Sequence, residues 1–211
     1  MNAELIKKEV AQNGFYYAEK VKQEEVEGVV AELGKTLFIT DIIERDNGRI
    51  LNSATDMFLH TDQPDANYLV WHCLKQAAQG GETVLVNIEE AFTDLSADHQ
   101  ECLKQIKLRL SLLSPQELTH PFYESGRFFY SPSLLLDEYS KDQNEAVSAF
   151  QTALERVPKK TIRLRKNDFF ALDNTRLMHG RKSFQSATGR HLKRYLIQAD
   201  GIENTGSMSL P

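Results

Sequence analysis

Short segments of strand-forming composition follow one another from about residue 50 to near the end of the chain, and they limit the possible folds more than any other feature. Turn-forming residues such as Gly80-Gly81 and Lys166-Asn167-Asp168 separate them. Short strands at this spacing are typical of a β-sandwich or barrel. The candidate strands span residues 58–62, 68–73, 83–86, 108–112, 128–130, 161–165, 169–172, 176–179 and 190–198.

Three segments have helical periodicity instead. Apolar residues recur at helical spacing around residues 5–10, before Gly14, and over residues 23–33, before Gly34. Residues 145–157 form the third amphipathic stripe. Residues 36–40, which follow the second helix, have strand-forming composition. We therefore predict a mainly β protein with flanking helices. No internal repeat or linker is evident, so we expect one domain over residues 1–211, with helices at roughly residues 3–34 packing on the sheets.

Composition excludes several classes of function. The chain has 25 basic and 30 acidic residues, a net charge of −5, which is not typical of a nucleic-acid-binding protein. No apolar run approaches the ~20 residues that a membrane helix needs, and the N-terminus has no signal-peptide pattern. We expect a cytoplasmic protein without nucleic-acid or membrane partners. The oligomeric state is left open.

His60 and Asp62 are the first candidate site residues. Two residues apart on a strand, they would direct an imidazole and a carboxylate into one space. That pair suits a divalent first-row metal, with a distant histidine completing a facial triad. The alternative is a hydrogen-bonded His–Asp pair in a polar turn, which the tripeptide favours when considered without the rest of the chain.

His179, Arg190 and Arg194 are the remaining candidates near the C-terminal end. His179 lies at the end of a predicted strand and is either the third ligand or a histidine paired beside a turn. Arg190 and Arg194, four residues apart on one strand, would face the same side. Two arginines inside a barrel need anionic partners. The alternative is that both point to solvent.

These residues occur in an order that resembles a known enzyme family. Six short motifs follow one another over nearly the whole chain: His60-Thr61-Asp62, Gly80-Gly81-Glu82-Thr83, Asp173-Asn174, His179-Gly180-Arg181, Arg190 and Arg194. The set resembles the TauD/TfdA (taurine dioxygenase and clavaminate synthase-like) branch of the Fe(II)/2-oxoglutarate dioxygenases. The resemblance implies a double-stranded β-helix, the cupin-like jelly roll, with helices packed outside.

The resemblance also implies residue roles. His60, Asp62 and His179 match the iron ligands, Thr83 the hydroxyl that contacts 2-oxoglutarate, and Arg190 the arginine that binds its distal carboxylate. Fe(II), 2-oxoglutarate and O2 would then be the cofactor and cosubstrates. A carboxylate at Asp62, which related halogenases lack, favours hydroxylation over halogenation.

The substrate is less constrained. Arg194 matches a position near the anionic group of the substrate in some relatives, with a structural ion pair as the alternative, and Tyr130 is a loose match to a strand at the mouth of the site. We expect an oxygenase that hydroxylates a small, carboxylate-bearing molecule, such as an amino acid or its derivative. Only residues 114–139 leave room for a lid, which suits an open site for a carrier-tethered substrate or a lid completed by a partner. Desaturation, or a non-catalytic metal-binding jelly roll, is the alternative.

Overall fold

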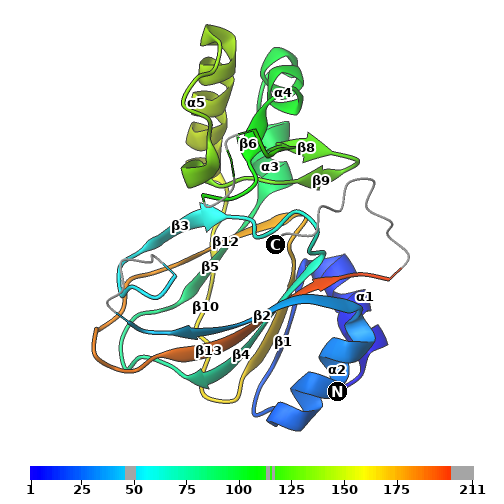
Figure 1. Ribbon diagram of the computed structural model, residues 1–211, viewed down its shortest axis with the longest axis vertical. Coiled ribbons are helices and arrows are strands. Elements are labelled where there is room, and N and C mark those ends of the chain that lie inside the picture. Colours follow the sequence, from blue (N-terminus) through cyan, green and yellow to red (C-terminus); the bar gives the residue numbers. More distant parts are fainter. Residues whose placement is uncertain (46–50, 113–114, 116, 201–211) are drawn as a thin grey trace.

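The computed structural model describes residues 1–45, 51–112, 115 and 117–200, and two antiparallel sheets that face each other form its centre (Figure 1). The five-stranded sheet has the order β1 (Phe15–Ala18), β11 (Phe169–Asp173), β4 (Tyr68–Lys75), β13 (His191–Gln198), β2 (Lys35–Ile43). The four-stranded sheet has the order β10 (Lys160–Ile162), β5 (Thr83–Asn87), β12 (Leu177–Arg181), β3 (Met57–His60). The architecture confirms the predicted jelly roll with flanking helices.

The space between the sheets is filled mainly by the inward-facing side chains of the five-stranded sheet. β4 is buried along most of its length, because one face meets the other sheet and the opposite face meets a helix. Its residues therefore show no polar and apolar alternation. The inner cluster consists of Ile42, Ala66, Leu69, Trp71, Cys73, Leu85, Leu164, Phe170, Leu172, Leu177, Leu192 and Leu196.

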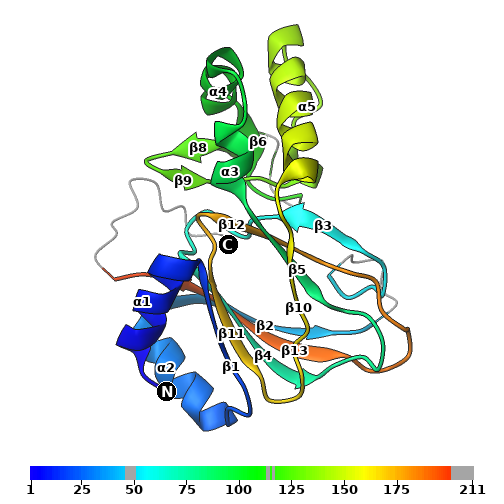
Figure 2. The same ribbon diagram turned by 180° about the vertical axis from the view of Figure 1, so that it is seen from behind.

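Two N-terminal helices cover the outer face of the five-stranded sheet (Figure 2). α1 (Ala3–Asn13) begins at Asn2, whose side chain accepts a hydrogen bond from the Leu5 N–H, and ends at Gly14, whose φ of +80° suits glycine. α2 (Gln23–Leu33) buries the predicted stripe, including Val26, Val30 and Leu33, against the sheet. Both predicted helices are confirmed, and they pack where expected.

A second helical group packs on the outer face of the four-stranded sheet, at one end of the molecule (Figures 1 and 2). It contains α3 (Ile88–Thr93), α4 (Ala97–Lys104) and α5 (Lys141–Arg156), of which the periodicity predicted the last. α3 and α4 are too short to show a helical stripe. Between the helices lie two small hairpins and a 3₁₀ turn: β6 (Lys107–Arg109) with β7 (Thr119–Pro121), β8 (Tyr123–Glu124) with β9 (Arg127–Phe128), and η1 (Pro132–Leu134).

The strand predicted over residues 58–62 ends earlier than expected. β3 is an edge strand that pairs with β12, and its last pair is His60 opposite His179. The next N–H, that of Thr61, donates instead to the carbonyl of Tyr130 at 2.8 Å. Asp62 therefore lies in the turn that follows the strand.

Candidate metal centre

Three side chains of types that can bind a metal meet at the end of β3. His60 and His179 are register partners on adjacent strands, and Asp62 follows two residues later. Candidate ligand atoms of the three residues lie within 4.8 Å of one another, and His179 Nε2 is 3.7 Å from Asp62 Oδ2. Both imidazoles are almost completely buried. Two imidazoles and one carboxylate on one side of a cavity match the facial arrangement of non-haem iron sites.

Hydrogen bonds fix the turn that carries Asp62. The Asn174 side chain accepts from the Asp62 N–H at 2.8 Å and donates to the carbonyls of Gln63 and Ala66 at 3.1 and 3.0 Å. Thr61 is held by Tyr130, whose N–H donates to the Thr61 hydroxyl at 3.0 Å. Asn174 thus stabilises a turn that lies more than a hundred residues away in the sequence.

The protonation states of this cluster suit a cation. His60 Nδ1 is 2.9 Å from the carbonyl of Phe58, so Nδ1 donates and the Nε2 lone pair is left for a metal. Burial lowers the pKa of both imidazoles, which keeps them neutral. Burial raises the pKa of the Asp62 carboxyl, but the net shift is downward, and the adjacent Arg194 guanidinium is the largest cause that lowers it. Neutral imidazoles and an ionised carboxylate are the forms that bind metals, so these residues fit Fe(II).

Arg194 contacts the candidate ligand directly. Its Nη1 lies 3.0 and 3.1 Å from the two carboxylate oxygens of Asp62. Of the two interpretations of Arg194, the ion pair is therefore present in the structure. A substrate contact remains a prediction.

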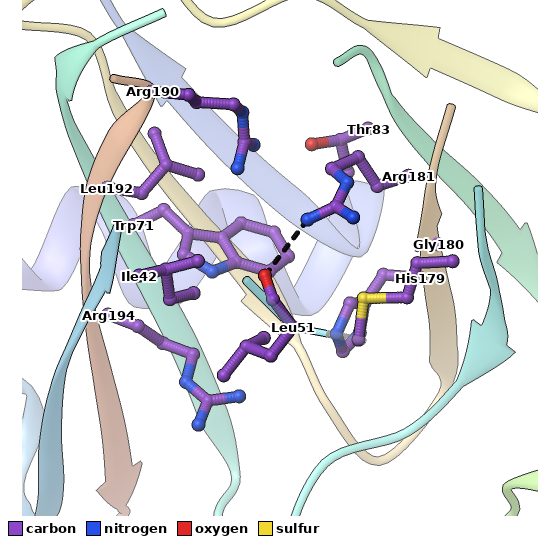
Figure 3. Close-up of a pocket in the computed structure, with 11 residues that line it drawn as sticks. Ile42, Leu51, Trp71, Thr83, His179, Gly180, Arg181, Arg190, Leu192 and Arg194 are labelled. Atoms are coloured by element: carbon purple, nitrogen blue, oxygen red, sulfur yellow. Dashed lines mark hydrogen bonds between the residues drawn. The ribbon is translucent and has the colours of Figure 1, made fainter. Parts of the chain in front are cut away.

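A pocket extends from His179 between the two sheets (Figure 3). Arg190 and Thr83 lie at one end and Arg194 at the other, so of the two orientations left open by the sequence, both arginines have the interior one. The residues that line it are Ile42, Leu51, Met57, Trp71, Thr83, His179, Gly180, Arg181, Arg190, Leu192 and Arg194.

Arg190 is a buried cation whose neighbours suggest an anionic ligand. It is 3 % exposed, and its Nε donates to Gln76 Oε1 at 2.9 Å. In the part of the chain that the structure describes, it forms no salt bridge with a carboxylate. Burial and the nearby Arg181 lower its pKa to about 10, which leaves it charged at neutral pH. A buried unpaired charge is costly, and a ligand carboxylate would compensate it.

The two segments beside this arginine are held by other arginines. Arg181 donates to the carbonyls of Leu51, Ser53 and Thr55, which fastens residues 51–55 along the pocket (Figure 3). Arg163 donates to the carbonyls of Ala77 and Gly80 and pairs with Glu82 at 3.2 Å. Arg163 thereby stabilises the turn over residues 77–82, which leads directly into Thr83.

Tyr130 is placed elsewhere. Its ring is buried against Phe122 and Phe150, and its hydroxyl accepts a hydrogen bond from Gln151. It lines a separate cavity beside α5 and not the pocket next to the metal ligands. Its side chain belongs to the core beside α5, and its backbone carbonyl accepts a hydrogen bond from the Thr61 N–H.

Several pocket residues were not identified from the sequence. The pocket is lined in part by Trp71 and Leu51, and Gln76 accepts a hydrogen bond from Arg190. None of these three residues belongs to a motif. The strand period could have indicated Trp71, because it lies two residues from Leu69 and Cys73 on the inner face of β4. Ser114, where the predicted lid segment begins, lies outside the described residues.

Comparison with known proteins gives a consistent result. Residues 14–196 match the family model described as Taurine catabolism dioxygenase TauD, TfdA family. No curated protein sequence matches the chain significantly. No helix among the described residues is long and apolar enough to cross a bilayer.

Solved structures share the fold. PvcB from Pseudomonas aeruginosa is 20% identical with a TM-score of 0.71, covering 95% of this chain and 81% of its own. The non-heme iron oxygenase OrfP, in complex with (3S)-hydroxy-L-Arg, is 16% identical with a TM-score of 0.74, covering 94% of this chain and 79% of its own. Asparagine oxygenase, in complex with Fe(II), 3-hydroxyasparagine and succinate, is 13% identical with a TM-score of 0.74, covering 93% of this chain and 77% of its own.

Proposed function

Because the chain belongs to the TauD/TfdA family of Fe(II)- and 2-oxoglutarate-dependent oxygenases, we propose that it hydroxylates an unactivated C–H bond of a small carboxylate-bearing molecule, with release of succinate and CO2. The substrate class we favour is an amino acid or its derivative, free or carrier-tethered. The cluster of His60, Asp62 and His179, with the buried and unpaired Arg190 at the far end of the adjoining pocket, is the observation that carries the proposal.

His60, Asp62 and His179 would hold the iron. Iron and 2-oxoglutarate together supply O2 activation and C–H oxidation when bound. Arg194 keeps the Asp62 carboxylate ionised and fixes its orientation through both oxygens. Asn174 fixes the same residue through its backbone.

Arg190 and Thr83 would bind the distal carboxylate of 2-oxoglutarate. A guanidinium offers a permanent charge and two parallel N–H donors to a carboxylate, and the Thr83 hydroxyl adds one more donor. Both lie in the pocket that begins at His179. The apolar side chains of Ile42, Leu51 and Leu192 line this pocket and would exclude water from it.

Two features bear on the substrate. Arg194 faces the metal ligands and can offer a cationic contact to a substrate carboxylate besides its pair with Asp62. OrfP and asparagine oxygenase have been crystallised with hydroxylated amino acids, which supports the amino-acid class here. The same groups allow desaturation as an alternative outcome.

A metal-binding jelly roll without catalysis is the second candidate. It would need the three ligands, but it would have no use for a buried arginine without a carboxylate partner at the far end of the pocket. Arg190 therefore distinguishes the two candidates.

The test is an anaerobic titration of the Fe(II)-loaded protein with 2-oxoglutarate, followed by the weak visible charge-transfer band of the chelate. We expect a saturable band, and none in His60→Ala. Air-saturated reactions with a panel of L-amino acids and their amides would then be assayed for succinate and for mass increases of 16. Iron binding without the band would contradict the oxygenase function, and mass losses of 2 would identify desaturation.

A further inference from the structure

The single tryptophan of the chain, Trp71, carries a buried donor that the protein itself does not use. Its side chain is on the inner face of β4, and the residue is 6 % exposed. The indole Nε1–H finds no acceptor among the residues that the structure describes. Buried tryptophan N–H groups usually have a partner, and leaving one unpaired destabilises the protein.

The ring is fixed in this position. It stacks on Phe170 with ring centroids 5.7 Å apart and an interplanar angle of 12°, and it meets the His179 ring edge-on at 5.1 Å. Phe170 and Arg194 are its register partners on the two neighbouring strands. The indole therefore has packing contacts on several sides, and the unpaired donor is a feature of a well-packed side chain.

The neighbouring groups lack acceptors as well. Arg194 Nε and His179 Nδ1 are buried without hydrogen-bond partners in the described part of the chain. All three atoms belong to residues that line the same pocket. This end of the pocket thus holds two unpaired donors, Trp71 Nε1–H and Arg194 Nε–H, and a ligand that brings carboxylate or keto oxygens would complement them.

We propose that Trp71 Nε1–H donates a hydrogen bond to the keto oxygen of 2-oxoglutarate, the acceptor that a plain dicarboxylate lacks. The inference rests on the proposed function, because it requires a ligand that reaches from the metal ligands to Arg190. Figure 3 shows the Trp71 ring between Arg190 and Arg194, with His179 nearby. A ligand that joined the candidate metal ligands to Arg190 would pass along this ring. Trp71 is then a cosubstrate-binding residue that selects a 2-oxo acid.

The first test observes the donor itself. The chain gives one indole cross-peak in a ¹H–¹⁵N spectrum, because it contains one tryptophan. With Zn(II) as a diamagnetic substitute for Fe(II), 2-oxoglutarate should shift this peak and slow exchange of the indole proton with solvent. Glutarate, which has both carboxylates but no keto group, should produce neither effect at equal occupancy.

The second test removes the donor. Trp71→Phe, or replacement by 3-benzothienylalanine, an isostere with sulfur in place of the N–H, should weaken 2-oxoglutarate binding by about tenfold or more. Zn(II) affinity and glutarate affinity should not change. The isostere replaces only this side chain and preserves the ring stacking if the phenylalanine variant folds poorly.

The outcomes separate this inference from the proposed function. A shift with 2-oxoglutarate together with the selective loss of affinity supports both. A second outcome is that calorimetry shows 2-oxoglutarate binding while the indole peak does not shift and the isostere variant binds with unchanged affinity. That result overturns the role of Trp71 and does not contradict the oxygenase function. The donor would then serve another group, such as a substrate carboxylate. No binding of 2-oxoglutarate at all overturns both.

Discussion

Replacing Asn174 by alanine should weaken the fold and the metal centre by separable amounts. The side chain is 2 % exposed and makes three hydrogen bonds to backbone groups of residues 62–66, at 2.8, 3.1 and 3.0 Å. At ~1 kcal/mol net for each bond, Asn174→Ala should lower the unfolding free energy of the metal-free protein by about 3 kcal/mol. For a chain of this size, that corresponds to a Tm decrease of about 6–12 °C.

The same substitution releases the N–H of Asp62, so the carboxylate should lose its fixed orientation. Loss of such an outer contact typically costs about 10–100-fold in metal affinity. We would measure urea unfolding of the metal-free protein and Zn(II) affinity by competition with a chelator. The matched control is Asn144→Ala on α5, where an exposed asparagine also donates twice to carbonyls, and where we expect a change within ~0.5 kcal/mol and unaltered metal affinity.

The result that would refute this reasoning is a loss of stability with full metal affinity. It would mean that the turn is held by Asn174 while Asp62 keeps its orientation through Arg194 alone. Unchanged stability would refute the hydrogen bonds themselves.

Three further predictions concern the cosubstrate, the metal and pH. Arg190→Ala should raise the KM for 2-oxoglutarate by orders of magnitude, because removing a buried ion-pair partner costs ~3–5 kcal/mol, and an unchanged KM in a succinate-release assay would contradict the assignment. Chelator-stripped protein should gain about 2.7 kcal/mol of stability on adding Zn(II) at a hundred times its Kd, seen as a higher Tm, whereas His60→Ala should gain little. Partial burial raises the pKa of Glu44, but hydrogen bonds from Thr188 and from the N–H groups of residues 187–189 outweigh it and lower the pKa. The ionised Glu44 should therefore add to the free energy of unfolding above its unfolded-state pKa of ~4.3, and this stabilisation should be lost as the pH falls further. The difference in Tm between the wild type and Glu44→Gln should then become smaller in acid. A Tm difference that does not change with pH would argue against this role of Glu44.

Periodicity predicted the helices that carry long amphipathic stripes and missed the short ones. α2 was predicted with the bounds that the structure has, because four apolar residues at helical spacing precede Gly34. α3 has only six residues, too few for an amphipathic stripe, although Asn87 caps its N-terminus. Its buried side chains share a core cluster with α5, which begins some fifty residues later in the chain.

Residue types and spacing made His60, Asp62 and His179 candidate ligands, but only the resemblance to a family favoured a metal site over a hydrogen-bonded pair in a turn. Strand alternation placed His60 and Asp62 on one face, yet Asp62 lies beyond the strand, and Asn174 and Tyr130 fix the turn that carries it. That His60 and His179 face each other depends on the pairing of β3 with β12, which lie more than a hundred residues apart. No local signal specifies such a pairing.

The position of Asp62 just past the strand end also bears on how the site can work. A ligand within the ladder would have its backbone fixed by β12, whereas Asp62 is fixed by one asparagine amide and one arginine. The side chains of Asn174 and Arg194 therefore control the orientation of the carboxylate. Arg194 lies on β13 of the five-stranded sheet, and Asn174 directly follows β11 of the same sheet. His60 and His179 belong to the four-stranded sheet. The metal would thus connect the two sheets at this end of the sandwich. It follows that metal binding should reduce hydrogen exchange in β3 and in β13 together, and protection confined to β3 would show that Arg194 does not couple the sheets.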